Sequence, residues 1–212
     1  MSVTHATILH PCQFTRSGLI GLLPENCEVL STEKILQCYR HLLSESKPNL
    51  IILSLQGVDY TVIDVLSLMD IIYKESKRHR ILIIMDVYRN SGLIDYLQET
   101  SSRIGFIDTQ NSLSIITRQI NELIVDKDSE LYSYNKTNVK PLSLRERQVL
   151  SGILMEFSYK QIAQMLSISS KLVGHYKRLA LKKLGVKSMQ SLLIPTNQLF
   201  RVPLIQTRSQ RL

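Results

Sequence analysis

The most constraining feature of the sequence is the stretch 141–193, which reads as several short helices, each opened by its own capping residue. Ser143 and Glu146 have the spacing of a capping box, in which the hydroxyl accepts from a backbone N–H and the carboxylate bonds back to the N-cap. Ser158 and Gln161 repeat this spacing at the next helix. Apolar residues follow each box at helical intervals. The stretch therefore predicts a small all-helical domain.

A longer and more basic helix follows the second box. Ser169 can cap it, and Gly185 lies where a glycine commonly follows a helix. Ser188 can cap a last short helix. On the long helix or at its ends lie Lys171, His175, Lys177, Arg178, Lys182 and Lys183. A short helix, a tight turn and a basic helix form the helix-turn-helix arrangement, which places its second helix in the DNA major groove.

This stretch resembles, without a gap, the DNA-binding domain of NarL/LuxR-type bacterial transcription regulators. The matching segments are Leu142-Ser143-x-Arg145-Glu146-Arg147-x-Val149-Leu150, Ser158-x-Lys160-x-Ile162-Ala163, Ile168-Ser169-x-Lys171-x-Val173 and Lys183-Leu184-Gly185-Val186. The resemblance implies a four-helix, all-α helix-turn-helix domain over residues 141–194.

The charge of the chain is concentrated in its C-terminal third. Residues 141–212 hold 12 Lys and Arg against Glu146 and Glu156, whereas residues 1–140 hold 14 basic and 16 acidic residues. A basic region beside a near-neutral one is typical of a polyanion-binding protein. A membrane-surface helix would need a wide apolar face with aromatic residues, but Tyr176 is the only aromatic residue on the basic helix.

Cysteine usage and hydropathy indicate a cytoplasmic protein. Cys12, Cys27 and Cys38 are odd in number and lack a CxxC pair, so we expect reduced thiols and neither disulfides nor a metal site. No apolar run reaches 18 residues, and the N-terminus lacks the pattern of a secretory signal. We expect no membrane association and no cofactor.

The first 126 residues alternate strand-like apolar runs with helical patterns, which predicts five βα units and an open parallel sheet. The expected strands are 6–9, 28–30, 49–55, 80–85 and 103–107, and the expected helices are 14–23, 35–42, 62–72, 93–97 and 112–125. The continuous apolar runs of the third and fourth strands suit positions covered on both faces. Residues 127–140 are polar and aperiodic and read as a linker, and residues 195–212 as a basic tail.

The N-terminal region resembles the receiver domain of response regulators, with a flavodoxin-like α/β fold. The resemblance rests on Thr7-Ile-Leu-His-Pro-x-x-Phe-x-Arg16-Ser-Gly18-Leu and on Lys47-Pro-Asn-Leu-Ile-Ile-Leu-Ser54-Leu. Receivers hold Mg²⁺ with acidic residues and a phosphoryl group with a hydroxyl and a lysine. The corresponding positions here carry His10 and Pro11 (acidic pair), Ser54 (phospho-acceptor), Met85 (hydroxyl) and Thr109 (lysine). The resemblance therefore implies a pseudo-receiver without phosphorylation chemistry.

Degenerate receivers before a LuxR-type domain are similar to the auxiliary regulators of enteric bacteria of the RcsA and BglJ type, which can pair with a full response regulator. We therefore expect a transcription regulator that binds double-stranded DNA independently of phosphorylation, as a homodimer or as a heterodimer with a response regulator. Carried over from the family, the base-facing positions are Gly174, His175 and Arg178, the phosphate-facing positions are Lys160, Lys171, Lys177 and Lys182, and the dimerisation positions are Met189, Leu192 and Leu193.

Each of these roles has an alternative. Arg178 could grip a guanine edge or contact only a phosphate, and His175 could be an ordinary surface residue. Gly174 allows a close approach to DNA but is also compatible with neutral drift, and Leu192 can belong to the core of the domain. At the level of function, the alternative is a protein-interaction regulator that sequesters or modifies a partner without specific DNA binding. Enzymatic motifs such as HExxH and GxSxG are absent from the sequence, so we do not expect an enzyme.

Overall fold

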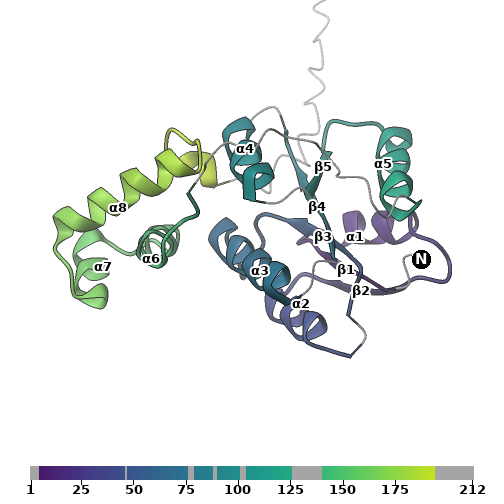
Figure 1. The fold of residues 1–212 in the computed structure, drawn as a ribbon, viewed down its shortest axis with the longest axis horizontal. Coiled ribbons are helices and arrows are strands. Elements are labelled where there is room, and N and C mark those ends of the chain that lie inside the picture. Colours follow the sequence, from purple (N-terminus) through teal and green to yellow (C-terminus); the bar gives the residue numbers. More distant parts are fainter. Residues whose placement is uncertain are drawn as a thin grey trace, which may run out of the picture.

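The computed structural model describes residues 5–45, 47–75, 79–87, 90–100, 104–125 and 140–193. The expected tail 195–212 lies outside the described residues, and so does the expected linker except for Lys140. Two domains follow one another along the chain, an α/β domain and a helical domain (Figure 1).

The N-terminal domain contains one parallel sheet with the strand order β2-β1-β3-β4-β5. Its strands are β1 (His5–Leu9), β2 (Glu28–Thr32), β3 (Leu50–Ser54), β4 (Arg80–Met85) and β5 (Ile104–Asp108). All five residues of β3 are buried, because the central strand is covered on both faces. This strand order is the flavodoxin-like order, which confirms the predicted fold class.

Helices cover both faces of this sheet (Figure 1). They are α1 (Gln13–Ile20), α2 (Ile35–Leu42), α3 (Val62–Glu75), α4 (Ser91–Thr100) and α5 (Leu113–Val125). Leu50 and Ile52 pack with Leu19 of α1 and Ile120 of α5, whereas the alternate residues of β3 pack with α2, α3 and α4. This alternation follows from the two-residue period of a strand.

Some predicted boundaries were wrong. Helix α1 ends at Ile20 rather than at position 23, since Gly21 and Pro24 bracket a turn in which the N–H of Leu22 donates to the Leu19 carbonyl. Helix α4 is longer at both ends than the predicted 93–97, and β2 continues to Thr32. Polar residues at these element ends carry no periodic signal, which is why the sequence pattern misses them.

The C-terminal domain consists of α6 (Leu144–Leu154), α7 (Tyr159–Leu166), α8 (Ser170–Lys183) and a short 3-10 helix, η1 (Met189–Leu192). Both predicted capping boxes are formed, at Ser143 and at Ser158. Ser169 caps α8 by accepting from the N–H of Leu172, as predicted. Ser188 does not cap: its side chain makes no capping hydrogen bond, so that prediction was wrong.

Left-handed residues set the turns between these helices. Glu156 follows α6 with φ 63° and Ser167 follows α7 with φ 53°. Glu156 adopts a conformation that glycine favours and that other residues rarely take. Gly185 after α8 has φ 65°, which confirms the helix end predicted there.

The two domains share one continuous apolar core, and polar contacts fix their joint. The N–H of Leu142 donates to the buried Tyr96 hydroxyl at 3.2 Å. Arg147 of α6 forms an ion pair with Asp70 of α3 at 2.6 Å. Gly92 and Gly185 bring two backbones together so closely that a Cβ on Gly92 would lie 2.2 Å from the Gly185 oxygen. Figure 1 accordingly shows the end of α8 and η1 beside α4.

Candidate DNA-binding surface and a filled receiver pocket

The sheet places the degenerate receiver residues at its carboxyl edge. His10 follows β1 and Ser54 ends β3, and these neighbouring strands flank the point where the strand order reverses. Ligands of open α/β sheets bind at such a point. Both side chains are 6% exposed. The edge where a receiver holds its phosphoryl group is therefore closed over in this chain.

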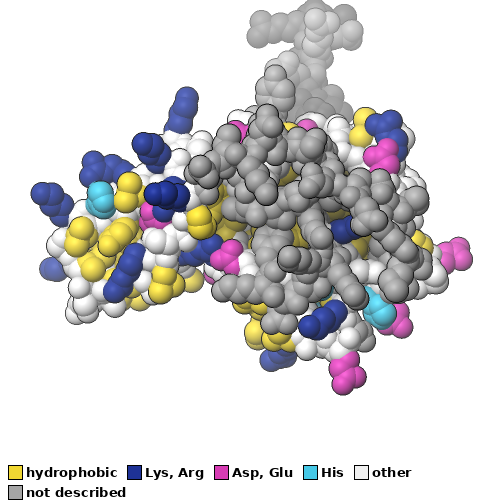
Figure 2. Space-filling view, viewed as in Figure 1, with side chains coloured by type: hydrophobic (Ala, Val, Ile, Leu, Met, Phe, Trp, Pro, Cys, Tyr) yellow, Lys and Arg dark blue, Asp and Glu magenta, His cyan; other side chains and the backbone are white. Residues whose placement is uncertain are grey.

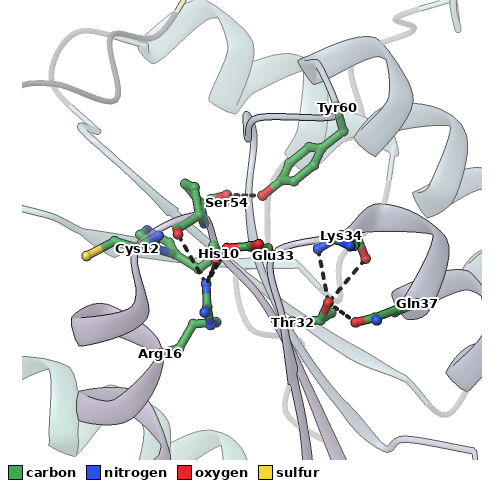
Figure 3. Close-up of polar contacts among 10 residues, drawn as sticks. His10, Cys12, Arg16, Thr32, Glu33, Lys34, Gln37, Ser54 and Tyr60 are labelled. Atoms are coloured by element: carbon green, nitrogen blue, oxygen red, sulfur yellow. Dashed lines mark hydrogen bonds and ion pairs between the residues drawn. The ribbon is translucent and has the colours of Figure 1, made fainter.

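Tyr60 fills this edge, and the sequence reasoning did not single it out. Its hydroxyl lies 2.6 Å from the Ser54 hydroxyl, which itself donates to the Gln56 carbonyl at 3.0 Å, so Tyr60 is the donor to Ser54 (Figure 3). A Cβ on Gly57 would lie 2.1 Å from the Tyr60 ring, so the ring packs against a residue that must lack a side chain. Burial raises the pKa of Tyr60 to about 12, and the phenol stays neutral.

The other polar groups of this edge are also satisfied within the chain. Arg16 donates to the carbonyls of His10 and Pro11 at 2.6 and 3.1 Å, and its guanidinium lies 3.8 Å from Glu33 (Figure 3). Burial lowers the pKa of His10, which favours the neutral ring. The His10 Nδ1 accepts from the N–H of Cys12 at 3.0 Å. The Arg16 charge is thus directed at backbone carbonyls rather than into an open anion site.

Two further predicted receiver positions, Met85 and Thr109, lie at the ends of β4 and β5. Met85 ends β4 with 2% exposure, and its carbonyl accepts from the N–H of Thr109 at 3.1 Å. Thr109 itself is exposed beyond β5. Among the described residues, no group of three or more His, Cys, Asp or Glu side chains could hold a metal ion.

Helix α8 carries the predicted DNA-binding residues except Lys160, which is exposed on α7. His175 and Arg178 are exposed, as are Lys171 and Lys182, and Gly174 is half-buried. In Figure 2, dark blue Lys and Arg side chains gather over the lobe that the C-terminal domain forms, which Figure 1 labels α7 and α8. Of the residues of α8 that were predicted to contact DNA, Gly174 and Lys177 are thus half-buried and the others are open to solvent. Their assignment to bases or phosphates stays a prediction.

One residue of α7, Tyr159, supports the surface of α8. Tyr159, the first residue of α7, lies against the small core formed by Val149, Ile162 and Val173. The Lys177 ammonium is 5.7 Å from the centre of the Tyr159 ring, which is within reach of a cation–π contact. Neither the charge nor the helical period of the sequence pointed to Tyr159.

Glu146 anchors α6 to α8 beneath this surface. Its side chain is 3% exposed, and its Oε2 accepts from Lys183 Nζ at 2.7 Å and from the N–H of Ser143 at 2.6 Å. Burial alone would raise the pKa of Glu146, but the bonds from Lys183 and Ser143 hold it below its ordinary value. Lys183 is therefore a structural residue of the domain, whereas its neighbour Lys182 points to solvent.

The residues predicted for dimerisation differ in exposure. Leu193 is 48% exposed, Leu192 is 1% exposed, and Met189 is partly buried against the core shared by the two domains. In this conformation Leu193 offers free apolar surface and Leu192 does not. A dimer contact through this segment stays a prediction.

The C-terminal domain matches a known family. Residues 140–194 match the profile of the bacterial regulatory proteins of the luxR family. Over 102 residues the chain is 29% identical to the transcriptional regulatory protein TdiR of Thauera aromatica, an alignment that covers 48% of this chain and 43% of that protein. The chain thus aligns with less than half of the length of that relative.

Solved structures show the same succession of folds. The RcsB response regulator of Salmonella typhimurium, in a study of conformational dynamism for DNA interaction, has 20% identity, a TM-score of 0.58, and coverage of 91% of this chain and 96% of that chain. RcsB of Salmonella enterica serovar Typhimurium bound to the promoter P1flhDC has 19% identity, a TM-score of 0.52, and coverage of 90% and 96%.

A third match, a structure of two RcsB dimers bound to two parallel DNAs, has 20% identity and a TM-score of 0.51, and covers 90% of this chain and 96% of that chain. These likenesses establish a receiver-like fold followed by a helix-turn-helix fold. The chain therefore combines a C-terminal domain that carries the luxR-family sequence pattern with an N-terminal domain of receiver-like fold.

Proposed function

We propose that this protein is a sequence-specific DNA-binding transcription regulator that acts independently of receiver phosphorylation. The single observation that carries the DNA-binding part is the exposed basic helix α8 within a luxR-family domain. Arg178 would read a guanine edge through its fork, with His175 and Gly174 beside it at the bases. Lys160, Lys171, Lys177 and Lys182 would neutralise phosphates. A protein with this role would act in the cytoplasm, where bacterial DNA is.

Independence from phosphorylation is supported by the filled carboxyl edge of the sheet. Ser54 is bonded to Tyr60 and to the Gln56 carbonyl, so its hydroxyl is engaged on both sides. Phosphoryl transfer also requires Mg²⁺ and a cation for the phosphoryl oxygens, whereas His10 and Thr109 occupy those positions. The active concentration of the protein, or a partner, would then supply the regulatory input.

We propose a dimer as the working form, either of two copies or with a response regulator. The RcsB structure with dimers on two DNAs supports this proposal by analogy of fold alone. Leu193 and Met189 would contribute apolar contacts between the C-terminal domains. An uneven pair of half-sites in the DNA would favour the mixed dimer, and a two-fold symmetric site the homodimer.

The experiment that tests the proposal is genome-wide in-cell crosslinking of the tagged protein beside a Lys177→Ala/Arg178→Ala variant. Discrete peaks that vanish in the variant are the expected result, provided that both proteins are folded and equally abundant. Peaks that survive the two substitutions would exclude α8 as the recognition element. Treatment of the purified protein with a small phosphodonor such as acetyl phosphate should leave it unlabelled and its DNA affinity unchanged.

A second function is favoured by exposed apolar side chains near the filled edge. Phe14 follows β1 and Val58 follows β3, and they are 83% and 92% exposed. Such residues suit a protein contact, so the receiver-like domain could bind and sequester a partner regulator. In that case crosslinking would give no discrete peaks, and the full-length protein would bind unrelated and genomic duplexes equally.

The proposed regulator should instead show a salt-dependent affinity for its site. With about 4–6 phosphates neutralised per subunit, the plot of log K against log salt concentration should have a slope of about −4 to −5.

A further inference from the structure

Tyr159 occupies an unusual place on the DNA-binding surface. It is the first residue of α7, directly after the capping residue Ser158, and its half-buried side chain crosses from α7 to α8. A Cβ on Gly174 would lie 3.7 Å from Cε2 of its ring, an ordinary contact distance. The ring therefore lies against the small surface that Gly174 leaves on α8.

The same ring faces the charge of Lys177. The distance of 5.7 Å between Nζ and the ring centre places the ammonium within the range of cation–π attraction. A lysine side chain has several rotatable bonds and loses rotamer entropy when a ligand fixes it. A ring that already holds the ammonium in one region reduces that loss on binding.

Gly174 of α8 and Tyr159 of α7 are neighbours in the fold. Gly174 costs the helix about 1 kcal/mol relative to alanine, and the sequence alone offered no reason for it beyond close approach to DNA or neutral drift. In the structure a Cβ at position 174 would make only an ordinary contact with the Tyr159 ring, so the ring lies beside α8 at the place where the helix has no side chain.

We infer that Tyr159 is a positioning residue of the DNA-binding surface: its ring, seated against Gly174, holds the Lys177 ammonium where it neutralises a phosphate of double-stranded DNA. This inference rests on the proposed function, because it assumes that α8 enters a DNA groove. In this role Tyr159 acts through Lys177 and does not itself contact a base.

A double-mutant cycle on the full-length protein tests the inference. Affinity is measured by fluorescence anisotropy with a duplex carrying the crosslinked motif and with an unrelated duplex of equal length, over a range of salt concentrations. Tyr159→Leu keeps an apolar side chain but removes the ring, and should raise the Kd about 2–5-fold, the size of an exposed cation–π contact. Tyr159→Phe keeps the ring and should retain most of the wild-type affinity for DNA.

The coupling to Lys177 distinguishes positioning from packing. In the Lys177→Ala background, Tyr159→Leu should cause no further loss, because the cation that the ring holds is gone. Lys177→Ala alone should make the salt slope shallower by about 0.9, the value for one phosphate. Tyr39→Leu, the same change at a half-buried tyrosine of α2, is the matched control and should leave DNA affinity unchanged.

Two outcomes overturn the inference and differ from each other. If Tyr159→Leu costs the same affinity with and without Lys177, or lowers thermal stability in parallel, the ring is only packing between α7 and α8. If the wild-type protein binds neither duplex with a salt-dependent affinity, the proposed DNA-binding function fails and the inference fails with it. The inference is supported if Tyr159→Leu loses DNA affinity, Tyr159→Phe retains it, and Tyr159→Leu causes no further loss in the Lys177→Ala background.

Discussion

The carboxyl edge of the sheet and the exposed face of α8 are the two places where a protein of this type meets phosphate groups, and this chain equips them in opposite ways. At the sheet edge, Tyr60 fills the space, and Ser54 and Arg16 bond to groups of the same chain. On α8, Arg178 and Lys182 are exposed to solvent. A polar group with internal partners stabilises the fold, whereas an exposed cation remains available to a ligand.

If the domain acts without phosphorylation, as proposed, the difference explains how a receiver-like fold can persist without that chemistry. Acidic residues that hold Mg²⁺ repel one another when the metal is absent, so a metal site weakens its own domain. Replacing them with a neutral ring and bonded hydroxyls removes that repulsion. The domain also packs against the helical domain, with Asp70 of α3 and Tyr96 of α4 at the contact.

The largest effect on stability is expected from substitution of Tyr60, which fills the carboxyl edge of the sheet. Tyr60→Ala removes a side chain that is 3% exposed and leaves a cavity, so unfolding should require about 3–5 kcal/mol less free energy. Tyr60→Phe removes only the hydrogen bond to Ser54 and should cost about 1 kcal/mol. Chemical denaturation measures both. Neither change should alter the sequence preference of the folded protein on DNA, and a changed preference would mean that the two regions communicate.

A second prediction concerns the joint that connects the two regions. Gly92→Ala would place a Cβ against the Gly185 backbone, which cannot rotate away, and should destabilise the protein by about 3 kcal/mol. Gly18→Ala is the matched control, since a Cβ there meets nothing within 4 Å and should stabilise α1 by up to about 1 kcal/mol. Calorimetry should show the two domains melting separately only in Gly92→Ala. Equal effects of both substitutions would argue that the two domains do not pack together at these glycines.

A third prediction addresses α8. Arg178→Ala should weaken binding to the cognate site about 10–100-fold while changing stability by less than about 0.5 kcal/mol, because an exposed arginine holds little of the fold. Arg118→Ala on α5, an exposed arginine paired with Glu122, serves as the control and should leave DNA binding intact. A loss that is equal on cognate and unrelated duplexes would reassign Arg178 from a base to a phosphate.

The sequence could predict the helical domain well because its signals are local. Capping boxes at Ser143 and Ser158 and the glycine after α8 act within a few residues, and all three are formed. The buried strands β3 and β4 were equally readable as continuous apolar runs. Ser188 shows the limit, since a capping residue type does not ensure a cap when the following segment is a short 3-10 helix.

The residues that the sequence did not reveal depend on contacts between distant segments. Tyr60 reaches Ser54 across a loop, Tyr159 meets Lys177 across two helices, and Arg147 reaches Asp70 across two domains. No periodic pattern marks such residues, because each is defined by the partner it meets after folding. A glycine in a helical segment is the available clue, since it can mark a place where another group approaches closely.

The smallest predicted effect is a pH dependence of the protein's stability that comes from Glu146. Glu146 is a charged group that, unlike the cations of α8, has its partners inside the fold, in Lys183 and the N–H of Ser143. Its lowered pKa means that the carboxylate contributes stability above the ordinary value of 4.5 and loses that contribution as the pH falls through the folded-state pKa. Glu146→Gln should therefore cost about 1–2 kcal/mol near neutral pH and progressively less in acid.

Denaturation midpoints of the wild-type protein and Glu146→Gln, followed from pH 7 to about pH 3, measure this convergence. Glu156→Gln is the matched control, because Glu156 is an exposed acid of the same domain and its substitution should change stability little. If the gap between wild type and Glu146→Gln stays constant in acid, the carboxylate charge is not what joins α6 to α8. A gap near zero at every pH would instead mean that the hydrogen bond from the Ser143 N–H, which glutamine can also accept, is the stabilising contact.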